Sequence, residues 1–511
     1  MFNYMGEQKE NKTKYLYGAS VQGIQDFIFQ TNKLKEIVGA SELVANICTD
    51  AFNDFEPMMV DNQARKEKSI VRAAGNIKYI FEEREDCEKA VKDFPRKVMT
   101  MAPGITISQA VVKYPTQEIA DFSAAVNQLE RNLRTQRNKP VRSMTLGLIA
   151  TRRSPATGLP AVTDKNQENQ EELLDEGSLL KRNAEKSMND SIAIKAFPDG
   201  VVEARSDDSD GNLWRNFEDD IDSKNDWIAV IHADGNGMGN IFERIGHDVN
   251  ALRDFSQNVD ELSKQAARAA FEAVRKNFDE KKIIPIRPIV LSGDDFAVIC
   301  RADFAVQYAA SFIENFEGKA TAITGENLTA CAGIAFVKSS YPFHYAIHLA
   351  ESLCVRAKNA AKGLSKESEK LPPSCLMFHK VQDSFIEDFE EIVQRELTPQ
   401  PNHLSFEYGP YYCGSHAKDL PSVRQIEAEM EKLNSKEGNA VRSHLREWLN
   451  MLFENVGAAD QKMKRLKAVN ELAGKNIDKK YENLESSGKV CIPYYDILSL
   501  HSVTYTETKK K

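Results

Sequence analysis

Two acidic motifs constrain the fold and the chemistry of this chain more than any other feature. The first, WIAVIHADGNGMGNIF at residues 227–242, carries Asp234, and the second, PIVLSGDDFAVIC at residues 288–300, carries Asp294 and Asp295. In each motif an apolar run ends in a carboxylate beside glycine, which is typical of a buried strand that enters a tight turn. Two such strands side by side would gather three carboxylates around one point. That arrangement favours metal-dependent phosphoryl or nucleotidyl transfer.

The residues near the three acids suit a nucleotide and a divalent metal. Mg²⁺ or Mn²⁺ binds oxygen ligands, so carboxylates and the phosphates of a nucleotide together complete its coordination. Backbone N–H groups of the glycine-rich run after Asp234 could receive phosphate oxygens at the start of the next helix. Two lysines four residues apart share one face of a predicted helix and could reach a triphosphate. The nucleotide contacts expected in this half are Gly235, Asn236, Gly237, Gly239, Ser292, Gly293, Lys358 and Lys362.

Simpler interpretations of the same residues stay open. Asp294 and Asp295 could belong to an ordinary hairpin turn, and Asp234 could be the N-cap of a helix. The two lysines could form a solvated helix face. His232 precedes the first acid and is expected to be a packed histidine rather than a catalytic one.

An internal repeat organises the first two thirds of the chain. Segment 15–29 (YLYGASVQGIQDFIF) can be laid over the first motif, and segment 69–81 (SIVRAAGNIKYIF) resembles the second. The alignment places Ser20 on Asp234, Gly23 on Gly237, Gly75 on Gly293 and Asn76 on Asp294. Each half reads as strand, helix, strand, turn, strand, helix, strand and helix. We therefore expect an α+β fold with two ferredoxin-like palm domains in tandem, each an antiparallel sheet with helices on one face.

Changes in pattern along the chain predict four regions. They are a degenerate first palm at 12–150, a polar inter-palm region at 151–225, a catalytic second palm at 226–366 and a helical C-terminal domain at 367–511. Within the inter-palm region, SLLKRNAEKSMNDSIAIKAF is expected to form one helix. The C-terminal region is expected to be helical because its apolar residues recur at three- and four-residue spacing.

Composition excludes several classes of protein. The formal net charge is −9, so any nucleic-acid contact must come from a local basic patch. The sequence contains no run of 18 apolar residues, so no membrane span is predicted. The N-terminal segment has no apolar signal-peptide core, so we expect a cytoplasmic protein. The eight cysteines form no CxxC pair, so no zinc site is expected and the thiols are expected to be buried.

Several segments resemble the large palm-domain subunit of type III CRISPR effector complexes. They are SVQGIQDFIFQTNKLKEIVGASEL at 20–43, AAGN at 73–76, ADGNGMG, SGDD, AESLCVRAKNAAK at 350–362 and CLMFHKVQDSF at 375–385. The resemblance implies a polymerase-cyclase that joins ATP molecules into cyclic oligoadenylates, with ATP bound across the two palms and the chemistry in the second. It implies that Asp234, Asp294 and Asp295 bind metal, that Ser292 and Gly293 line the nucleotide, and that Lys358 contacts the triphosphate.

The chain also departs from the pattern of that family. Many members begin with an HD nuclease domain, for which there is no room before residue 15, so single-stranded DNA cleavage is not expected. Many carry a cysteine zinc site between the palms, whereas TRRSPATGLPAV has no cysteine here. Ser292 replaces the first glycine of the family's GGDD turn. Asn236 stands where the family usually has a second acid, which removes one charge near the metals.

The expected function is a metal-dependent nucleotidyltransferase in which a ribose hydroxyl attacks an α-phosphate of ATP and pyrophosphate leaves. The acid-free first half, with Ser20, Gly75 and Asn76, could supply the acceptor nucleotide site. Guide and target RNA and other subunits of a type III CRISPR-like complex are the expected partners. Two alternatives stay open: a cyclic-dinucleotide synthase related to diguanylate cyclases, and a non-catalytic scaffold that binds RNA and partner proteins.

Overall fold

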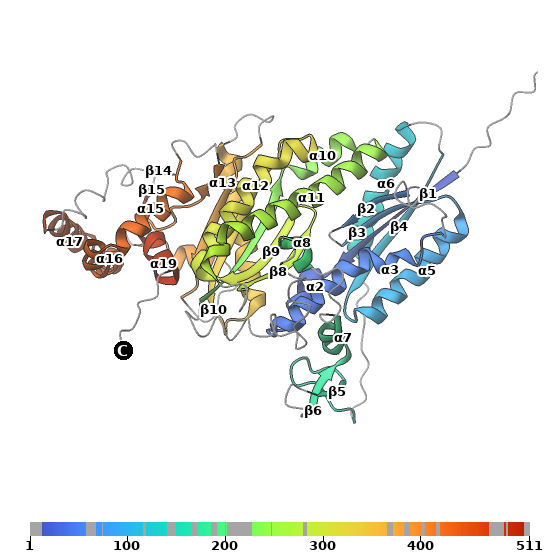
Figure 1. The fold of residues 1–511 in the computed structure, drawn as a ribbon, viewed down its shortest axis with the longest axis horizontal. Coiled ribbons are helices and arrows are strands. Elements are labelled where there is room, and N and C mark those ends of the chain that lie inside the picture. The colour runs from blue at the N-terminus through green and yellow to red at the C-terminus, as the bar shows by residue number, and fades with distance from the viewer. Residues whose placement is uncertain are drawn as a thin grey trace, which may run out of the picture. The chain divides into compact units, whose positions relative to one another are not determined.

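The chain forms two compact units in the computed structural model (Figure 1). The first comprises Met1–Ile192, Gly237–Ser263 and Ile289–Asp294, and the second comprises Ala193–Asn236, Lys264–Pro288 and Asp295–Lys511. The structure describes residues 13–57, 68–73, 75–115, 119–139, 150–165, 171–184, 192–199, 201, 227–246, 248–278, 284–364, 371–382, 389–399, 404–414, 420–469, 485–486 and 489–504.

The first unit is built on a four-stranded antiparallel sheet with the strand order β2-β3-β1-β4. Its strands are β1 (Thr13–Gln22), β2 (Ser69–Ala73), β3 (Asn76–Phe81) and β4 (Thr106–Pro115). Its main helices are α1 (Ile24–Ile28), α2 (Leu34–Cys48), α3 (Asp50–Asn53), α5 (Arg84–Met101) and α6 (Ile119–Arg137). The central strand β1 alternates its side chains between two covered faces, which explains why it is buried from Leu16 to Val21.

Helices cover both faces of this sheet. On one face α6 packs closely on β1, so a Cβ on Gly18 would lie 2.9 Å from a methyl group of Leu129 and that side chain would have to shift. On the other face Tyr17 stacks on Phe52, and Phe52 meets Phe94 of α5 edge to face at 5.1 Å. The expectation of helices on a single face was therefore wrong for this palm.

The α6 side of the first unit also holds a segment that follows β7 in the chain. Helix α10 (Met238–Ile245) and the start of α11 (Val249–Val274) lie there. Leu252 of α11 joins Leu16, Leu129 and Leu133 in one buried apolar cluster, against which Phe242 of α10 also packs. Burial of these side chains is the main force that holds the segment in this unit.

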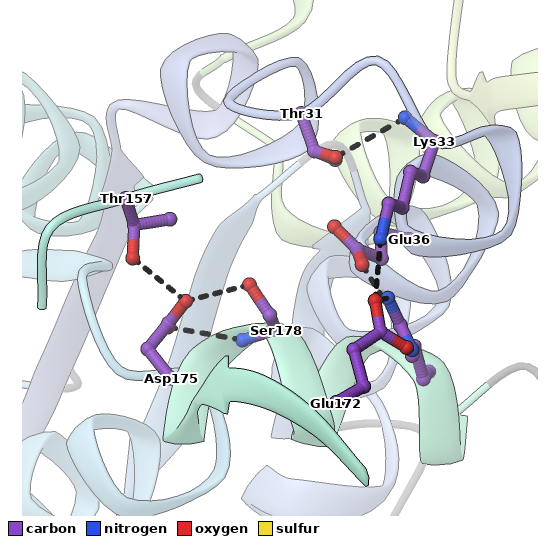
Figure 2. A network of polar contacts seen from close by, with 8 residues as sticks. Thr31, Lys33, Glu36, Thr157, Glu172, Asp175 and Ser178 are labelled. Carbon is purple, nitrogen blue, oxygen red and sulfur yellow. Dashed lines mark hydrogen bonds and ion pairs between the residues drawn. The ribbon is translucent and has the colours of Figure 1, made fainter. Parts of the chain in front are cut away.

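The inter-palm region folds as a small hairpin and helix against α2 (Figure 2). It contains β5 (Ala161–Lys165), β6 (Glu171–Asp175) and α7 (Glu176–Ala184). Glu172 accepts hydrogen bonds from Lys33 at 2.7 Å and from Arg182 at 2.6 Å, and Arg182 also donates to Glu36 of α2 at 2.8 Å. The single helix expected here is two, α7 and α8 (Ile192–Ala196), with residues 185–191 outside the described part.

The second unit holds a six-stranded sheet with the order β13-β11-β10-β7-β9-β8, whose edge strand β8 ends in the first unit. Its strands are β7 (Trp227–Asn236), β8 (Ile286–Ser292), β9 (Asp295–Arg301), β10 (Thr329–Lys338), β11 (Cys375–Lys380) and β13 (Tyr411–Tyr412). The pairing of β10 with β11 is parallel, so the sheet is mixed rather than purely antiparallel. The parallel strand β11 lies outside the four strands that repeat the first sheet, which are β8, β9, β7 and β10.

Helices again cover both faces of the second sheet. Helix α12 (Ala305–Thr324) lies on one face, where Phe312 stacks on Phe296 at 4.3 Å. Helix α13 (Phe343–Leu364) lies on the other, where a Cβ on Gly333 would collide with the carbonyl oxygen of Ala350 at 1.9 Å. The two sheets and their helices therefore repeat the same order, which confirms the tandem palms.

The C-terminal region is mainly helical, as expected. Its helices are α14 (Phe389–Arg395), α15 (Val423–Asn434), α16 (Lys436–Glu454), α17 (Val456–Val469) and α19 (Tyr494–Thr504), with short strands β12 (Leu404–Ser405), β14 (Glu485–Ser486) and β15 (Lys489–Cys491). All eight cysteines are buried and unbridged, as expected. Among the described helices, none is long and apolar enough to cross a membrane.

Candidate functional site

Asp234 lies near the end of β7, where the strand is about to leave the sheet. It stands opposite Cys331 of β10, and its side chain lies on the α13 face of the sheet with His232. Gly237 then takes a positive φ of 75° as the N-cap of α10, so the backbone turns sharply just after the acid. The expected strand that delivers a carboxylate to a glycine turn is therefore present.

Lys358 reaches Asp234 from α13. Its Nζ forms an ion pair with Oδ2 of Asp234 and donates a hydrogen bond to the carbonyl oxygen of Gly235 at 2.9 Å. The Lys358 side chain is only 15% exposed, whereas that of Asp234 is 40% exposed. The lysine side chain is thus more buried than the carboxylate, which stays accessible to a ligand. Lys362 lies one turn further along α13 and is exposed.

Asp295 is the neighbour of Asp234 on the adjacent strand. The antiparallel register runs through the pair Ala233 and Phe296, so the next residues outward are these two acids. Burial, and then the negative charge of Asp234, raise the pKa of Asp295 to about 7, although Lys358 acts in the opposite direction. Although 44% of the side chain is exposed, its Oδ1 atom is buried and accepts no hydrogen bond from any described residue.

Two side chains on the same face extend this acidic group. His232 Nδ1 lies 3.6 Å from Oδ1 of Asp295, and burial lowers the pKa of this histidine. Burial raises the pKa of Glu351 of α13, and Asp295 adds to that effect. Glu351 was not identified from the sequence, where its only signal is its place about two turns before Lys358 on the same helix.

The SGDD turn is held by α11. Gly293 has a φ of 63°, which favours glycine. Its N–H donates to Asp260 at 3.4 Å, and its carbonyl oxygen accepts a hydrogen bond from Ser263 at 2.5 Å. Asp260 and Ser263 lie three residues apart on one helix face, a spacing that could have suggested them. Ser292, Gly293 and Asp294 lie on this turn, directly before Asp295.

Asn236 is buried at the end of β7, with only 2% of the residue exposed. Its amide donates to Thr329 at 3.0 Å and to Cys331 Sγ at 3.3 Å, which ties the end of β7 to β10. Its Oδ1 is buried and accepts no hydrogen bond from the residues that the structure describes. The residue that replaces the family's second acid thus fixes the strand that carries Asp234.

The first palm repeats this geometry without the acids. Ser20 lies near the end of β1, is 5% exposed, and accepts a hydrogen bond from Arg137 Nη2 of α6 at 3.0 Å. Arg137 is exposed and lies in the last turn of α6, as Lys358 lies late in α13. The repeat in the sequence aligned α6 with α13, but Arg137 was not identified there as a candidate site residue.

The alignment of the two turns was wrong by one residue. Ser20 pairs directly with Asn76 across β1 and β3, so Asn76 is the counterpart of Asp295 and not of Asp294. The reason lies in the turns. In the first palm the glycine with positive φ is Gly75, immediately before the strand, whereas in the second it is Gly293, one residue earlier. The two tight turns therefore differ in which position needs glycine.

The pair Asp234 and Asp295 has the chemistry of a magnesium–nucleotide site. Within the part of the chain that the structure describes, no three histidine, cysteine, aspartate or glutamate side chains are grouped to hold a metal ion by themselves. Mg²⁺ rarely uses such a cage, because it binds one or two carboxylates and takes its other ligands from phosphates and water. The buried Oδ1 of Asp295, which accepts no hydrogen bond from the described residues, and the half-exposed Asp234 fit that donor set.

Tandem palms with carboxylates at neighbouring strand ends define the class of nucleotide polymerases and cyclases of the palm type. Within that class, residues 227–366 match the family model of the second palm domain of Cas10/Cmr2. For residues 227–366 the resemblance to the large palm-domain subunit of type III CRISPR effector complexes is thereby confirmed, and this part of the chain is a second palm of that family. No curated protein matches it in sequence.

Solved structures show the same fold over nearly the whole chain. A chain of the Csm1–Csm4 cassette in complex with cA3 matches with a TM-score of 0.55 and 12% identity, covering 98% of this chain and 71% of that one. The cassette with pppApApA matches with a TM-score of 0.51 and 12% identity over 96% and 69%. The Csm1–Csm4 subcomplex of the type III-A CRISPR-Csm interference complex matches at 0.50 and 13% over 97% and 70%. At these identities the likeness concerns the fold.

Proposed function

We propose that this protein is a metal-dependent nucleotidyltransferase that converts ATP into cyclic oligoadenylates and releases pyrophosphate. The observation that carries the proposal is the pairing of Asp234 with Asp295 at adjacent strand ends, one half-exposed and the other with a buried oxygen that accepts no hydrogen bond from the described residues. In the reaction a ribose 3′- or 2′-oxygen bonds to an α-phosphorus, the bond from that phosphorus to the β-phosphate oxygen breaks, and the hydroxyl proton is lost.

Asp234 and Asp295 would hold the metal, with Asp294 of the same turn as the third acid. A bound Mg²⁺ or Mn²⁺ lowers the pKa of an attacking hydroxyl and neutralises charge on the α-phosphate and on the pyrophosphate. Burial, and then the negative charge of Asp234, disfavour the ionised form of Asp295 and raise its pKa. A divalent cation removes that penalty.

Lys358 has two parts in this proposal. It neutralises Asp234 while no nucleotide is bound, which lets two acids share one face of the sheet. Its Nζ has a third donor beyond those used by Asp234 and Gly235, and this donor can turn to a triphosphate oxygen. Phosphate contacts are also proposed for the backbone at Gly235, Gly237 and Gly239, and for Ser292, Gly293, Asn236 and Lys362.

The first palm is proposed to contact the acceptor nucleotide through Ser20, Gly75 and Asn76. Ser20 and Asn76 face each other across two strands and are neutral, so this palm lacks the carboxylates that a metal needs. Arg137 supplies a positive charge beside Ser20, to whose hydroxyl it donates a hydrogen bond. We therefore add Arg137 to the proposed phosphate contacts.

The similar structures support an adenylate substrate and a setting in a CRISPR complex. Their names include cA3 and pppApApA, which fit a product and an intermediate of adenylate oligomerisation. One of them belongs to a type III-A CRISPR-Csm interference complex. We propose that this chain works in antiviral defence with other subunits and with guide and target RNA.

Mass spectrometry of reaction products tests the proposal. Purified protein is incubated with Mg²⁺ or Mn²⁺ and either ATP or GTP, with and without target RNA and partner subunits. Oligoadenylate with equimolar pyrophosphate per bond is expected from ATP. A cyclic dinucleotide from GTP would favour the diguanylate-cyclase-like alternative. Binding of ATP without product under every condition would favour the scaffold.

A further inference from the structure

A buried lysine ties the inter-palm hairpin and helix to the first palm. Lys181 of α7 is 2% exposed, and its carbonyl oxygen would lie 1.6 Å from a Cβ on Gly39 of α2. The two helices can approach this closely only because residue 39 is glycine, so the backbone of Lys181 is held against the palm. An ammonium group buried in this way loses its hydration, which is costly unless protein atoms replace the water.

The ammonium group of Lys181 contacts the end of helix α1. Its Nζ donates to the carbonyl oxygen of Phe27 at 2.6 Å and to Oε1 of Gln30 at 3.2 Å, and it lies 4.1 Å from the centre of the Phe27 ring. Burial lowers the pKa of Lys181 to about 8, although Asp175 and Glu36 act in the opposite direction. The group therefore stays mainly charged near neutral pH and keeps its donors for α1 and the residues after it.

The other end of α1 packs on the turn that precedes Asn76. A Cβ on Gly75 would be 2.5 Å from Cδ1 of Ile24, so the first residue of α1 lies directly against this turn. The turn is also joined to β1, because the N–H of Val21 donates to the carbonyl oxygen of Gly75 at 2.8 Å. One short helix therefore connects the contacts of Lys181 with this turn.

We propose that Lys181 is a positioning residue for the acceptor nucleotide of the first palm. By holding the end of α1, it fixes Ile24 and hence the turn with Gly75 and Asn76, which lies opposite Ser20. The inference rests on the proposed function, in which this turn contacts the acceptor. Lys181 acts through α1 and not by contact with the nucleotide. Its effect can be large, because a displacement of about 1 Å in a bound reactant can cost about a hundredfold in rate.

Two variants separate this role from simple packing of the inter-palm hairpin and helix. Lys181→Met keeps an apolar side chain of similar length but removes the ammonium donors. Arg182→Met removes the same charge from the next residue, whose guanidinium donates to Glu36 and Glu172. Both variants lose polar contacts of α7, but the contacts with α1 belong to Lys181.

Hydrogen exchange of the protein without nucleotide tests the connection through α1. We expect Lys181→Met to raise exchange about tenfold at residues 24–30 and 75–81, whereas Arg182→Met should raise it mainly at 171–184. Equal exchange at 24–30 in the two variants would overturn the proposal, because the whole segment and not Lys181 would then hold α1. Exchange at 75–81 that stays at the wild-type level in Lys181→Met would overturn it as well.

Binding and turnover of a 5′-triphosphorylated adenylate dimer test the effect on the acceptor. Lys181→Met should bind the dimer about five- to tenfold more weakly, and KM for the dimer should rise while KM for ATP as the donor changes by less than about twofold. Equal changes in both KM values, or wild-type binding of the dimer, would contradict a positioning role. The proposed function fails in a different way, because then the wild-type protein itself binds no dimer, which would overturn the acceptor site and this inference together.

Discussion

Arg137 Nη2 donates a hydrogen bond to the hydroxyl of Ser20 at 3.0 Å, at the place in the first palm where Lys358 contacts Asp234 in the second. Each palm thus brings a cation from the helix after its fourth strand to the end of its first strand. In the second palm that cation meets a carboxylate, and in the first it meets a neutral hydroxyl. In the proposed function, Arg137 beside this neutral hydroxyl is a contact for phosphate.

Replacing Arg137 by glutamine should weaken ATP binding by about five- to twentyfold, equivalent to roughly 1–2 kcal/mol. Isothermal titration with ATP measures it directly. Arg134→Gln is the matched control, because it removes the same charge from an exposed residue one turn earlier on α6. Equal effects of the two substitutions would show that Arg137 acts only through net charge.

Lys358→Met should lower kcat/KM for ATP by at least about tenfold, or roughly 1.4 kcal/mol of transition-state stabilisation. The methionine keeps most of the apolar stem but leaves Asp234 and Asp295 without the nearby positive charge. A smaller effect is expected for Lys362→Met, one turn further and exposed. The initial rates of pyrophosphate release decide the matter, and a Lys358→Met enzyme with wild-type kinetics would remove this lysine from the site.

Asp175 stabilises the inter-palm hairpin and helix (Figure 2). It accepts hydrogen bonds from the N–H and hydroxyl of Ser178 at 3.1 and 2.7 Å and from Thr157 at 3.0 Å. Burial raises the pKa of Asp175, but these hydrogen bonds outweigh it and hold the pKa below its usual value. Its stabilising contribution is therefore present above pH 4 and is lost as the pH falls through the folded-state pKa.

Asp175→Asn should therefore raise the hydrogen exchange of the described part of 150–184, at a cost of about 1–3 kcal/mol. Thr157→Ala removes one of the three hydrogen bonds and should cost less. Exchange rates near neutral pH measure both. If Asp175→Asn left the exchange of this segment unchanged, the carboxylate would not be what holds it.

Much of the palm architecture could be predicted from the sequence, because it depends on the order of apolar segments. Asp234 was expected at a strand end, and it lies there, since an apolar run followed by glycine has few other solutions. The helices on both faces could not be read from the same pattern. Gly18 and Gly333 reveal them only in the structure, where each allows a helix to approach the sheet.

The residues that complete the sites were harder to predict. Arg137, Asp260 and Glu351 come from helices, and the rotation of a helix against its sheet depends on packing over the whole interface. The counterpart of Asn76 is Asp295 and not Asp294, because the glycine of the tight turn lies one position earlier in the second palm. Sequence similarity between the halves is too low to fix a register to one residue, whereas strand pairing fixes it.

Asp496 should make stability depend on pH. It accepts a hydrogen bond from Tyr411 at 2.7 Å, and burial raises its pKa to about 7. The folded state keeps this proton in a range where the unfolded state has lost it, so the contribution of Asp496 to stability falls as the pH rises from about 4 to about 7. Asp496→Asn removes this titration while keeping an acceptor for Tyr411.

The melting temperature of Asp496→Asn relative to the wild type should therefore rise between about pH 5 and about pH 8. Comparing variant with wild type at each pH cancels the titration of all other groups. A difference in melting temperature that stays constant over this range would mean that Asp496 titrates at an ordinary pKa.

Pyrophosphate release by the double variant Asp294→Ala, Asp295→Ala tests the central claim most directly. The assay uses ATP and Mg²⁺ or Mn²⁺ under whichever conditions give wild-type product, with circular dichroism as the check of folding. Ser20→Ala serves as the control, because the first palm holds no carboxylate at that place. We predict that the double variant is folded and releases no pyrophosphate, while Ser20→Ala keeps the metal dependence of the wild type. Wild-type release from the folded double variant would contradict the assignment of catalysis to the second palm.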